Sequence, residues 1–286
     1  MKTKNILLSF LIAFLFIGTA IAQGDLITTE QFKDLQKNTE NLTIIDASKA
    51  KLYKKSHING AINIPYKKLN QKKGAVKGLL LSTEELASFL GSKGVSDQDM
   101  IVVYDEGSQK YSSRVYWVLK KLGAPNVKLL HKDNDSWRKN RIKLTSTVPS
   151  VKAKTFTPNV NADICISTDA IDVETMVLLD ARSADEFNGV VVNEKSYSKG
   201  HLPNAIHLEF KDVLNKNKSF KTAEQLTAML EEKGLTADKT YVMYCKAGIK
   251  AAVLYVAFTQ IVDFPNVKLY DGAYLEWEAL SKPIDK

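Results

Sequence analysis

The stretch "VMYCKAGIKAAVLY" (242–255) runs from apolar, strand-like residues through Cys245, two lysines and Gly248 into an alanine-rich segment. A second stretch, "VVYDEGSQKYSSRVYW" (102–117), has the same shape and carries Asp105 where the first has its cysteine. Apolar residues followed by a short polar loop and a helical run predict a strand, a tight loop and a helix. The chain therefore contains this unit twice.

The likeness between the two halves extends beyond this unit. "LTIIDASKAKLY" (42–53) matches "VLLDARSADEF" (177–187), and "SHINGAINIPYKKL" (56–69) matches "GHLPNAIHLEFKDV" (200–213). The second half carries extra residues, which we place in "FNGVVVNEKSYSKG" (187–200). The sequence thus predicts two copies of one domain.

Each half alternates strand-like and helical segments, most clearly in the second half. Continuous apolar strands separated by helices indicate a mostly parallel sheet with helices on both faces, so we predict an α/β protein of two tandem domains. The expected strands are 176–181, 205–210, 241–245 and 266–271, and the expected helices are 222–235 and 250–261.

The predicted boundaries follow from composition. "TSTVPSVKAKTFTPNVNA" (145–162) has two prolines and many small polar residues, which is typical of a linker. We place the first domain at 23–148, the linker at 149–162 and the second domain at 163–286.

The first 22 residues have the features of a secretory signal peptide. A basic start, "MKTKN", precedes the apolar run "ILLSFLIAFLFIG", and "AIA" before Gln23 fits an A-x-A cleavage site. A membrane anchor is the alternative, but the apolar run is short for a bilayer and no stop-transfer flank follows. We therefore expect an exported protein, in the bacterial periplasm, without a stable membrane anchor after cleavage.

The formal net charge of +8 is modest for 286 residues, and the lysines are mostly scattered, which does not favour nucleic-acid binding. The densest basic cluster is "YKKLNQKKGAVK" (66–77), which we expect to be a solvated loop rather than a partner site.

The chain has two cysteines, Cys165 and Cys245. The sequence does not exclude a disulfide between them. A permanent bond would consume Cys245, so a catalytic role for that residue predicts that both are free and that Cys165 is a small buried hydrophobe.

Cys245 is expected at the carboxyl end of a strand, where α/β sheets bind ligands. The loop N–H groups and the start of the next helix would point at its sulfur and favour an anion. Lys246 and Lys250 add positive charge, and Gly248 permits a backbone conformation that a Cβ would resist. These features predict a reactive thiolate. A buried cysteine that only packs at a strand end is the alternative.

These motifs resemble the tandem-domain rhodanese family, which comprises sulfurtransferases of the thiosulfate or 3-mercaptopyruvate type. The resemblance rests on "LLDARSADEF", "GHLPNAIHLEF", "CKAGIK" and "LYDGAYLEWEAL", and it covers nearly all of the chain after the leader. It implies a catalytic second domain with Cys245 as nucleophile, and an inactive first domain in which Asp105 cannot carry sulfur. The loop residues implied to bind substrate are Lys246, Ala247, Gly248, Ile249 and Lys250.

Arg182 is similar to an arginine that the family places beside the active loop, where it can bind an anionic donor. The matching position in the first half is Ser48, so this charge occurs only in the half with the cysteine. A surface ion pair with Asp185 or Glu186 is the alternative.

The implied reaction has two steps. The Cys245 thiolate attacks the outer sulfur of a small anionic donor such as thiosulfate, sulfite leaves, and a thiol or cyanide acceptor then removes sulfur from the Cys245 persulfide. No metal or organic cofactor is implied, and we expect a monomer. His57 and His201, like Asp46 and Asp180, recur at matching positions of both halves, so structural roles are expected for them.

The donor and the reaction class have alternatives. Two lysines in the loop favour doubly charged thiosulfate by Coulomb attraction, whereas mercaptopyruvate enzymes resemble "CGSGVT" at this place. A 3-mercaptopyruvate sulfurtransferase is therefore the second choice. A phosphatase related by fold would need a Cys-x5-Arg loop, but the chain has Ala251 at that position. A non-catalytic sulfur carrier or binding module is the remaining class.

Overall fold

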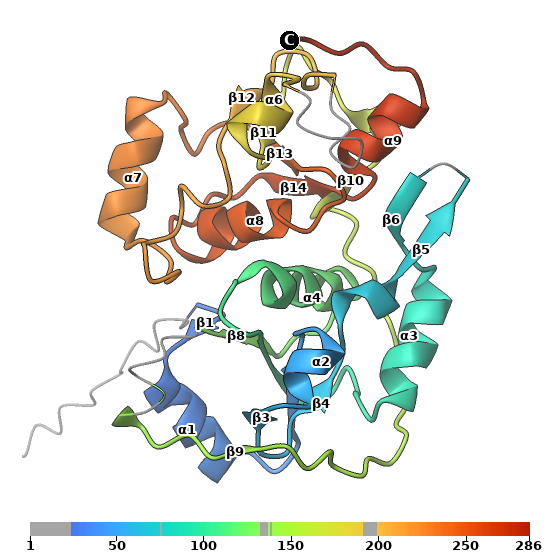
Figure 1. Ribbon diagram of the computed structural model, residues 1–286, viewed down its shortest axis with the longest axis vertical. Helices are drawn as coiled ribbons and strands as arrows, with labels where there is room; N and C mark the ends of the chain where they lie inside the picture. Colours follow the sequence, from blue (N-terminus) through green and yellow to red (C-terminus); the bar gives the residue numbers. More distant parts are fainter. Residues whose placement is uncertain (1–23, 75, 132–136, 138, 191–198) are drawn as a thin grey trace, which may run out of the picture.

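The protein is described by a computed structural model that covers residues 24–74, 76–131, 137, 139–190 and 199–286. The chain forms two α/β halves, which lie one above the other in Figure 1. The predicted leader and most of the predicted insertion lie outside the described residues. Within these ranges, no helix has both the length and the apolar character that a bilayer crossing needs.

The first half is built on a five-stranded parallel sheet. Its strands are β1 (Leu26–Ile27), β2 (Leu42–Asp46), β4 (Ile62–Asn63), β7 (Met100–Tyr104) and β8 (Val127–Leu130). They lie side by side in the order β1-β8-β7-β2-β4. The helices of this half are α1 (Thr29–Asn38), α2 (Ala50–Tyr53), α3 (Thr83–Ser92) and α4 (Lys110–Lys121).

The second half repeats this arrangement. Its strands are β10 (Cys165–Ile166), β11 (Val177–Asp180), β12 (Ile206–His207), β13 (Tyr241–Tyr244) and β14 (Val267–Tyr270). Their order, β10-β14-β13-β11-β12, matches the first sheet strand for strand, which confirms the predicted duplication. The strand expected at 205–210 is shorter than predicted, since only β12 pairs. The helices are α6 (Ala184–Phe187), α7 (Ala223–Glu232), α8 (Ala251–Gln260) and α9 (Ala273–Ala279).

Smaller elements complete the fold. The strands β3 (His57–Ile58) and β9 (Leu144–Thr145) form one antiparallel pair, and β5 (Asn70–Lys73) and β6 (Val76–Leu80) form another. Two short 3-10 helices are η1 (Tyr66–Leu69) and η2 (Thr168–Ala170). The β5–β6 hairpin extends from the first half towards the second, beside α9 (Figure 1).

Several helices begin at capping boxes that the sequence encodes locally. A Ser or Thr accepts a hydrogen bond from the backbone N–H three residues later, and a Glu or Gln side chain at that place accepts one in return. Each box fixes where its helix starts. The pairs are Thr28 and Gln31, Ser82 and Glu85, Ser183 and Glu186, and Thr222 and Gln225.

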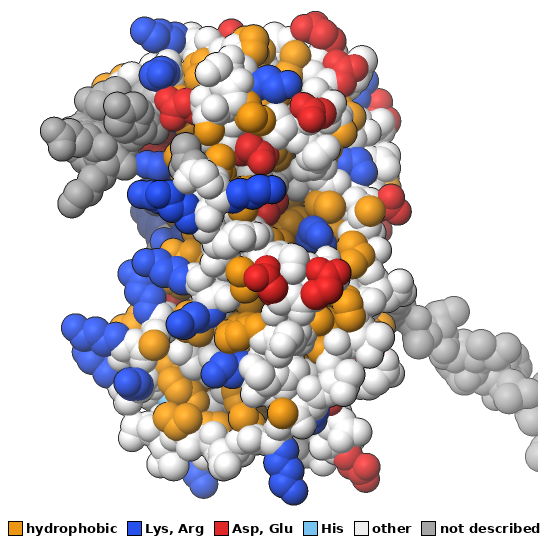
Figure 2. Space-filling view, turned by 90° about the vertical axis from the view of Figure 1, so that its right-hand side faces the viewer, with side chains coloured by type: hydrophobic (Ala, Val, Ile, Leu, Met, Phe, Trp, Pro, Cys, Tyr) orange, Lys and Arg blue, Asp and Glu red, His pale blue; other side chains and the backbone are white. Residues whose placement is uncertain are grey.

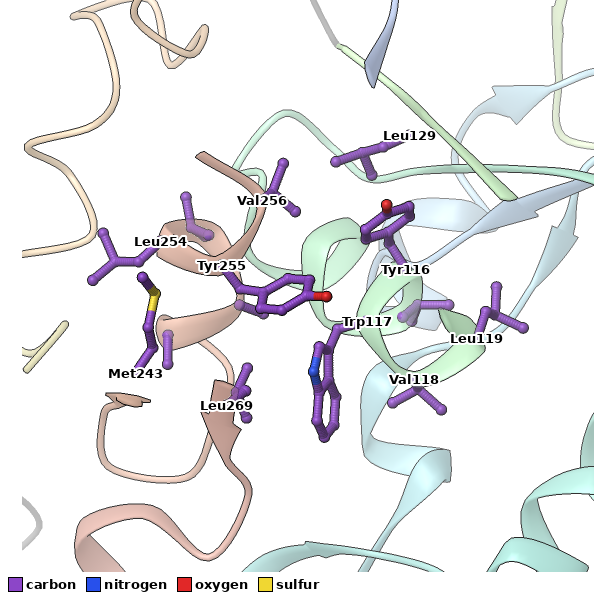
Figure 3. Close-up of a cluster of buried hydrophobic side chains, with 14 of the residues drawn as sticks. Tyr116, Trp117, Val118, Leu119, Leu129, Met243, Leu254, Tyr255, Val256 and Leu269 are labelled. Carbon is purple, nitrogen blue, oxygen red and sulfur yellow. The ribbon is translucent and has the colours of Figure 1, made fainter. Parts of the chain in front are cut away.

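The two halves share one hydrophobic core, in which α4 packs against α8. Figure 3 shows Tyr116 and Trp117 of α4 facing Tyr255 of α8. The Trp117 indole N–H donates to the carbonyl of Ile164 at 3.2 Å. Because these are the helices that follow the two matching loops, the interface brings both loops to the boundary between the halves.

The segment predicted as a linker lies along the first half. The backbone N–H of Asn159 donates to the carbonyl of Leu122, and the Lys154 ammonium pairs with Asp99 at 2.7 Å. The segment is therefore held by specific contacts.

Candidate active site

Cys245 directly follows β13, the central strand of the second sheet, and stands before α8. Its side chain is only 2% exposed, yet it lines a cavity of about 450 Å³ at the boundary of the two halves. Cys245 is therefore nearly buried but forms part of the cavity wall. Neither Cys245 nor Cys165 is in a disulfide, as a catalytic thiol requires. Cys165 is partly exposed rather than buried as expected, because β10 is at the sheet edge.

The backbone of the Cys245 loop is fixed from two sides. Gly248 has φ of +71°, and a Cβ built on it would lie 2.8 Å from Nη1 of Arg114. From the other side, the backbone N–H groups of Tyr274 and Leu275, at the start of α9, donate to the carbonyls of Cys245 and Lys246. The predicted need for glycine at position 248 is thus confirmed, and it has a second cause in the close approach of an arginine.

Arg114 belongs to α4 of the first half but lies under the loop of the second half. Its side chain is fully buried, pairs with Asp271 directly after β14, and stacks over the ring of Trp117. Its Nε and Nη1 atoms have no hydrogen-bond partner within the described part of the chain. The same Asp271 carboxylate accepts from the backbone N–H of Leu80 in β6. A buried positive charge of the inactive half therefore supports the cysteine loop.

Sequence reasoning missed Arg114. The signal was present, because "SSRVYWVL" places a charge directly before an apolar run in the middle of a helix expected to pack against the sheet. A charged residue is almost never fully buried unless it is paired, so its place in such a helix indicates a specific partner.

Both halves contribute walls to the cavity. The first half supplies the turn and hairpin that follow β4, which contain the basic cluster 66–77 expected to be a solvated loop. The lysines of the cluster are exposed, as expected, but the segment forms a 3-10 turn and a hairpin rather than a loop, and part of it lines the cavity. The lining residues are Tyr66, Lys67, Asn70, Lys77 and Gly78 from the first half and Cys245, Lys246, Ala247, Ile249, Lys250 and Leu275 from the second.

Lys250 reaches the cavity but is not an unpaired cation. Its ammonium lies 2.9 Å from the Glu186 carboxylate. Burial tends to raise the pKa of Glu186, but the hydrogen bond and the charge of Lys250 outweigh it, so the pKa is lowered from its usual value. The charge of Lys250 is therefore largely offset by Glu186.

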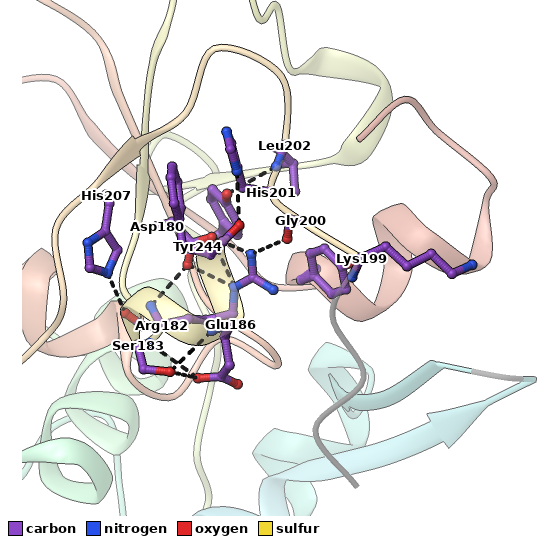
Figure 4. A network of polar contacts seen from close by, with 12 residues as sticks. Asp180, Arg182, Ser183, Glu186, Lys199, Gly200, His201, Leu202, His207 and Tyr244 are labelled. Atoms are coloured by element: carbon purple, nitrogen blue, oxygen red, sulfur yellow. Dashed lines mark hydrogen bonds and ion pairs between the residues drawn. The ribbon is translucent and has the colours of Figure 1, made fainter. Parts of the chain in front are cut away.

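Arg182 does not face the cavity, contrary to the expectation from sequence. Figure 4 shows its guanidinium against Asp180, and Nε and Nη2 donate to that carboxylate at 2.9 and 2.5 Å. Nη2 also donates to the carbonyl of Gly200, and the side chain is fully buried. The alternative of a surface pair with Asp185 or Glu186 is wrong as well. A carboxylate two residues away, inside the protein, holds the arginine in place.

The paired histidines have structural positions. His57 stacks on Tyr53, with ring centroids 3.8 Å apart, and its Nδ1 contacts the carbonyl of the same residue. His201 stacks on Phe187 at 3.7 Å and contacts the Phe187 carbonyl in the same way. One arrangement occurs in both halves, including the half without the cysteine, so catalysis does not depend on it.

The matching loop of the first half is filled by its own carboxylate. Asp105 accepts hydrogen bonds from the backbone N–H groups of Gly107, Gln109, Tyr111 and Ser112 and from the Ser108 hydroxyl. Its backbone differs from that of the active loop, since φ is positive at Gly107 and Gln109 rather than at the position that matches Gly248. The carboxylate of Asp105 is thus held by the N–H groups of its own loop, and the two loops differ in backbone conformation.

The described residues contain no group of three or more His, Cys, Asp or Glu side chains arranged to hold a metal ion.

Two matching α/β halves, one with a cysteine loop that opens into a cavity between them, define a class of two-domain thiol proteins. The rhodanese-like domain model matches residues 28–140 and 168–280, so the chain belongs to the rhodanese-like domain family, with two such domains in tandem.

Curated relatives cover most of the chain. It is 28% identical to a putative thiosulfate sulfurtransferase of Haloferax volcanii, over 82% of this chain and 85% of the relative. It is also 28% identical to a 3-mercaptopyruvate sulfurtransferase of Escherichia coli, over 82% of this chain and 84% of the relative. A crystal structure of a 3-mercaptopyruvate sulfurtransferase from Escherichia coli superposes with a TM-score of 0.78 at 25% identity, covering 88% of this chain and 99% of the other.

Proposed function

We propose that the protein is a sulfurtransferase that moves a sulfane sulfur from thiosulfate to a thiol or cyanide acceptor through a persulfide on Cys245. The observation that carries the proposal is the free Cys245 sulfur at the base of a cavity lined by lysines. The names of the two relatives from Haloferax volcanii and Escherichia coli support the reaction class.

The reaction divides into two displacements at sulfur. The Cys245 thiolate attacks the outer sulfur of thiosulfate, a bond forms between the two sulfurs, and sulfite leaves with the electron pair of the broken bond. An acceptor thiolate then attacks the terminal sulfur, takes it as a new persulfide, and releases the Cys245 thiolate. Cyanide in the same role gives thiocyanate. Backbone N–H groups of the loop would stabilise negative charge on the bound sulfur.

Thiosulfate is preferred over 3-mercaptopyruvate because Lys246 and the lysines of the first half give the cavity a positive lining. The pairing of Lys250 with Glu186 weakens one part of this preference, because a neutralised lysine attracts a dianion less. A 3-mercaptopyruvate sulfurtransferase is the second candidate, and the Escherichia coli relative favours it. A steady-state comparison of the two donors, with cyanide as acceptor, tests the preference.

The phosphatase alternative has little support in the geometry. Its loop would need a cation one residue after Lys250, but Ala251 is there and is fully buried at the start of α8. Hydrolysis of an aryl phosphate that is lost on Cys245→Ser would overturn this view. For a non-catalytic binding module, mass spectrometry after incubation with thiosulfate would show no gain of one sulfur on Cys245.

Export to the periplasm and a monomeric state are also part of the proposal. Export is supported by the composition of the first 22 residues. Fractionation of producing cells and N-terminal sequencing should find a mature chain that starts at Gln23.

A further inference from the structure

The β5–β6 hairpin of the inactive half is built against the active loop of the other half. Gly78 has φ of +96°, and a Cβ placed on it would lie 2.9 Å from the Cβ of Ala247. Two residues later, the Leu80 N–H donates to Asp271, which also pairs with Arg114 under the loop. The hairpin is therefore fixed beside the cysteine, and its position depends on the loop.

The 3-10 turn η1, which precedes the hairpin, is also held by specific contacts. Tyr66 lines the cavity and stacks on Tyr111, with ring centroids 4.8 Å apart and planes 5° from parallel. Tyr111 is held in turn by the Asp105 carboxylate of the inactive loop, which accepts its backbone N–H at 3.1 Å. Lys67, the next residue, is thus carried on a fixed support.

The cavity has a positive lining without an acidic residue. Among the residues that the structure describes, eleven line the cavity; four of these are lysines and none is Asp or Glu. Lys67 and Lys77 have no ion pair with a carboxylate anywhere in the described ranges. Lys77 is moreover directly opposite Lys72 in the hairpin register, and like charges in that position repel. Figure 2, which faces this side of the molecule, shows Lys and Arg side chains gathered around the hairpin. An anion between the two halves would relieve this repulsion.

The size of the cavity indicates whether the hairpin contacts the sulfur donor or the sulfur acceptor. The sulfur stays on Cys245 between the two steps, so donor and acceptor use the same cavity in turn and the cavity must fit the larger one. Its volume of about 450 Å³ is in the range of sites for small organic molecules and far exceeds the need of an inorganic donor. The part of the lining that lies on the first half is then available to the acceptor.

From these observations, and resting on the proposed function, we infer that Lys67 and Lys77 select the sulfur acceptor, and that this acceptor is a small thiol carrying two or more carboxylates. The carboxylates bind the lysines of the inactive half while the thiolate approaches the Cys245 persulfide. The inactive half thereby determines the specificity of the active one.

The test follows the discharge of the persulfide with acceptors that differ in charge. The full mature chain is loaded with thiosulfate, mass spectrometry verifies the gain of one sulfur on Cys245, and discharge is then measured with mercaptosuccinate and with 2-mercaptoethanol. The Lys67→Ala/Lys77→Ala variant is compared with Lys68→Ala/Lys73→Ala, which removes the same charge from the same segment at residues that do not line the cavity.

We expect the Lys67→Ala/Lys77→Ala variant to lose roughly tenfold in the second-order rate with mercaptosuccinate, and several-fold less with 2-mercaptoethanol. The control variant should lose much less, and high salt should reduce the difference between the two variants. Equal losses with both thiols, or equal losses in both variants, would overturn the inference while leaving the proposed function intact. Failure to form the persulfide at all would overturn the proposed function and this inference with it.

Discussion

The two loops of this protein show two ways of placing an anion at the end of a parallel strand. In the first half, Asp105 accepts five hydrogen bonds from its own loop and from the start of α4. In the second half, Cys245 is at the position that corresponds to Asp105, and it lines a cavity. Both residues line a cavity, so the difference between them is chemical: the Asp105 carboxylate is held by hydrogen bonds from its own loop and cannot carry sulfur, whereas a thiolate at the matching place is a nucleophile. The first loop also supports the cavity beside Cys245, because Asp105 accepts the Tyr111 N–H and Tyr111 stacks on Tyr66 of the cavity wall.

The largest effect is expected from Cys245→Ser. The hydroxyl is a much poorer nucleophile than a thiolate and cannot form a persulfide, so sulfur transfer should fall to the assay background. The substitution changes little volume, so thermal unfolding should stay close to that of the parent. Retained transfer would show that the reacting sulfur is elsewhere.

Replacing Arg114 by Met tests the link between the halves. It removes the guanidinium from the Asp271 carboxylate, whose side chain is 21% exposed and which keeps the Leu80 N–H as a donor, so the loss in the free energy of unfolding should stay below the roughly 3–5 kcal/mol that breaking a fully buried ion pair costs. Denaturant unfolding measures this cost, and the transfer rate should fall because the loop loses its support at Gly248. The double variant Arg114→Met/Asp271→Leu removes both charges and should be less destabilised than Arg114→Met alone. A double variant as unstable as the sum of both singles would contradict this account.

Asp105→Asn tests whether the inactive loop is a scaffold. One oxygen is replaced by an NH₂ group, so the loop N–H groups lose part of their acceptor, and we expect a loss of about 1–3 kcal/mol in unfolding free energy. Asp34→Asn on the exposed face of α1 is the matched control and should change stability by less than about 0.5 kcal/mol. If both variants are equally stable, the carboxylate of Asp105 does not organise its loop.

The smallest effects concern the pair of Lys250 and Glu186. Glu186→Gln releases the lysine charge, so the KM for thiosulfate should fall several-fold, whereas Lys250→Ala should raise it and affect 3-mercaptopyruvate less. Because the pKa of Glu186 is lowered, the pair stabilises the fold above the usual Glu pKa, and this contribution disappears as the pH falls through the lowered pKa. The stability difference between Glu186→Gln and the parent should therefore shrink on acidification. A KM that does not respond to either variant would remove Lys250 from donor binding.

Local patterns were sufficient for much of the fold and for the reacting residue. The match between the two halves predicted the duplication, apolar runs predicted the parallel strands, and Cys245 was marked by its strand–loop–helix context. Arg182 shows the limit of this approach. The family resemblance placed it beside the cysteine loop, but the nearby Asp180 carboxylate binds the guanidinium inside the protein. Whether the Arg182 guanidinium turns to the cysteine loop or to Asp180 depends on the direction of its side chain. A sequence pattern does not specify that direction.

By itself, the sequence determined two α/β domains, the cysteine at the end of a central strand, and the acidic replacement in the other copy. These depend on short-range periodicity and on residue types, which can be read along the chain. Only the tertiary structure decided that Arg114 supports the opposite loop, that Lys250 is paired, and that the basic hairpin lines the cavity. The pairing of Lys250 arises within the second half, whereas the other two features arise at the boundary of the halves, where α4 packs against α8 and residues far apart in the sequence, such as Arg114 and Asp271, become neighbours.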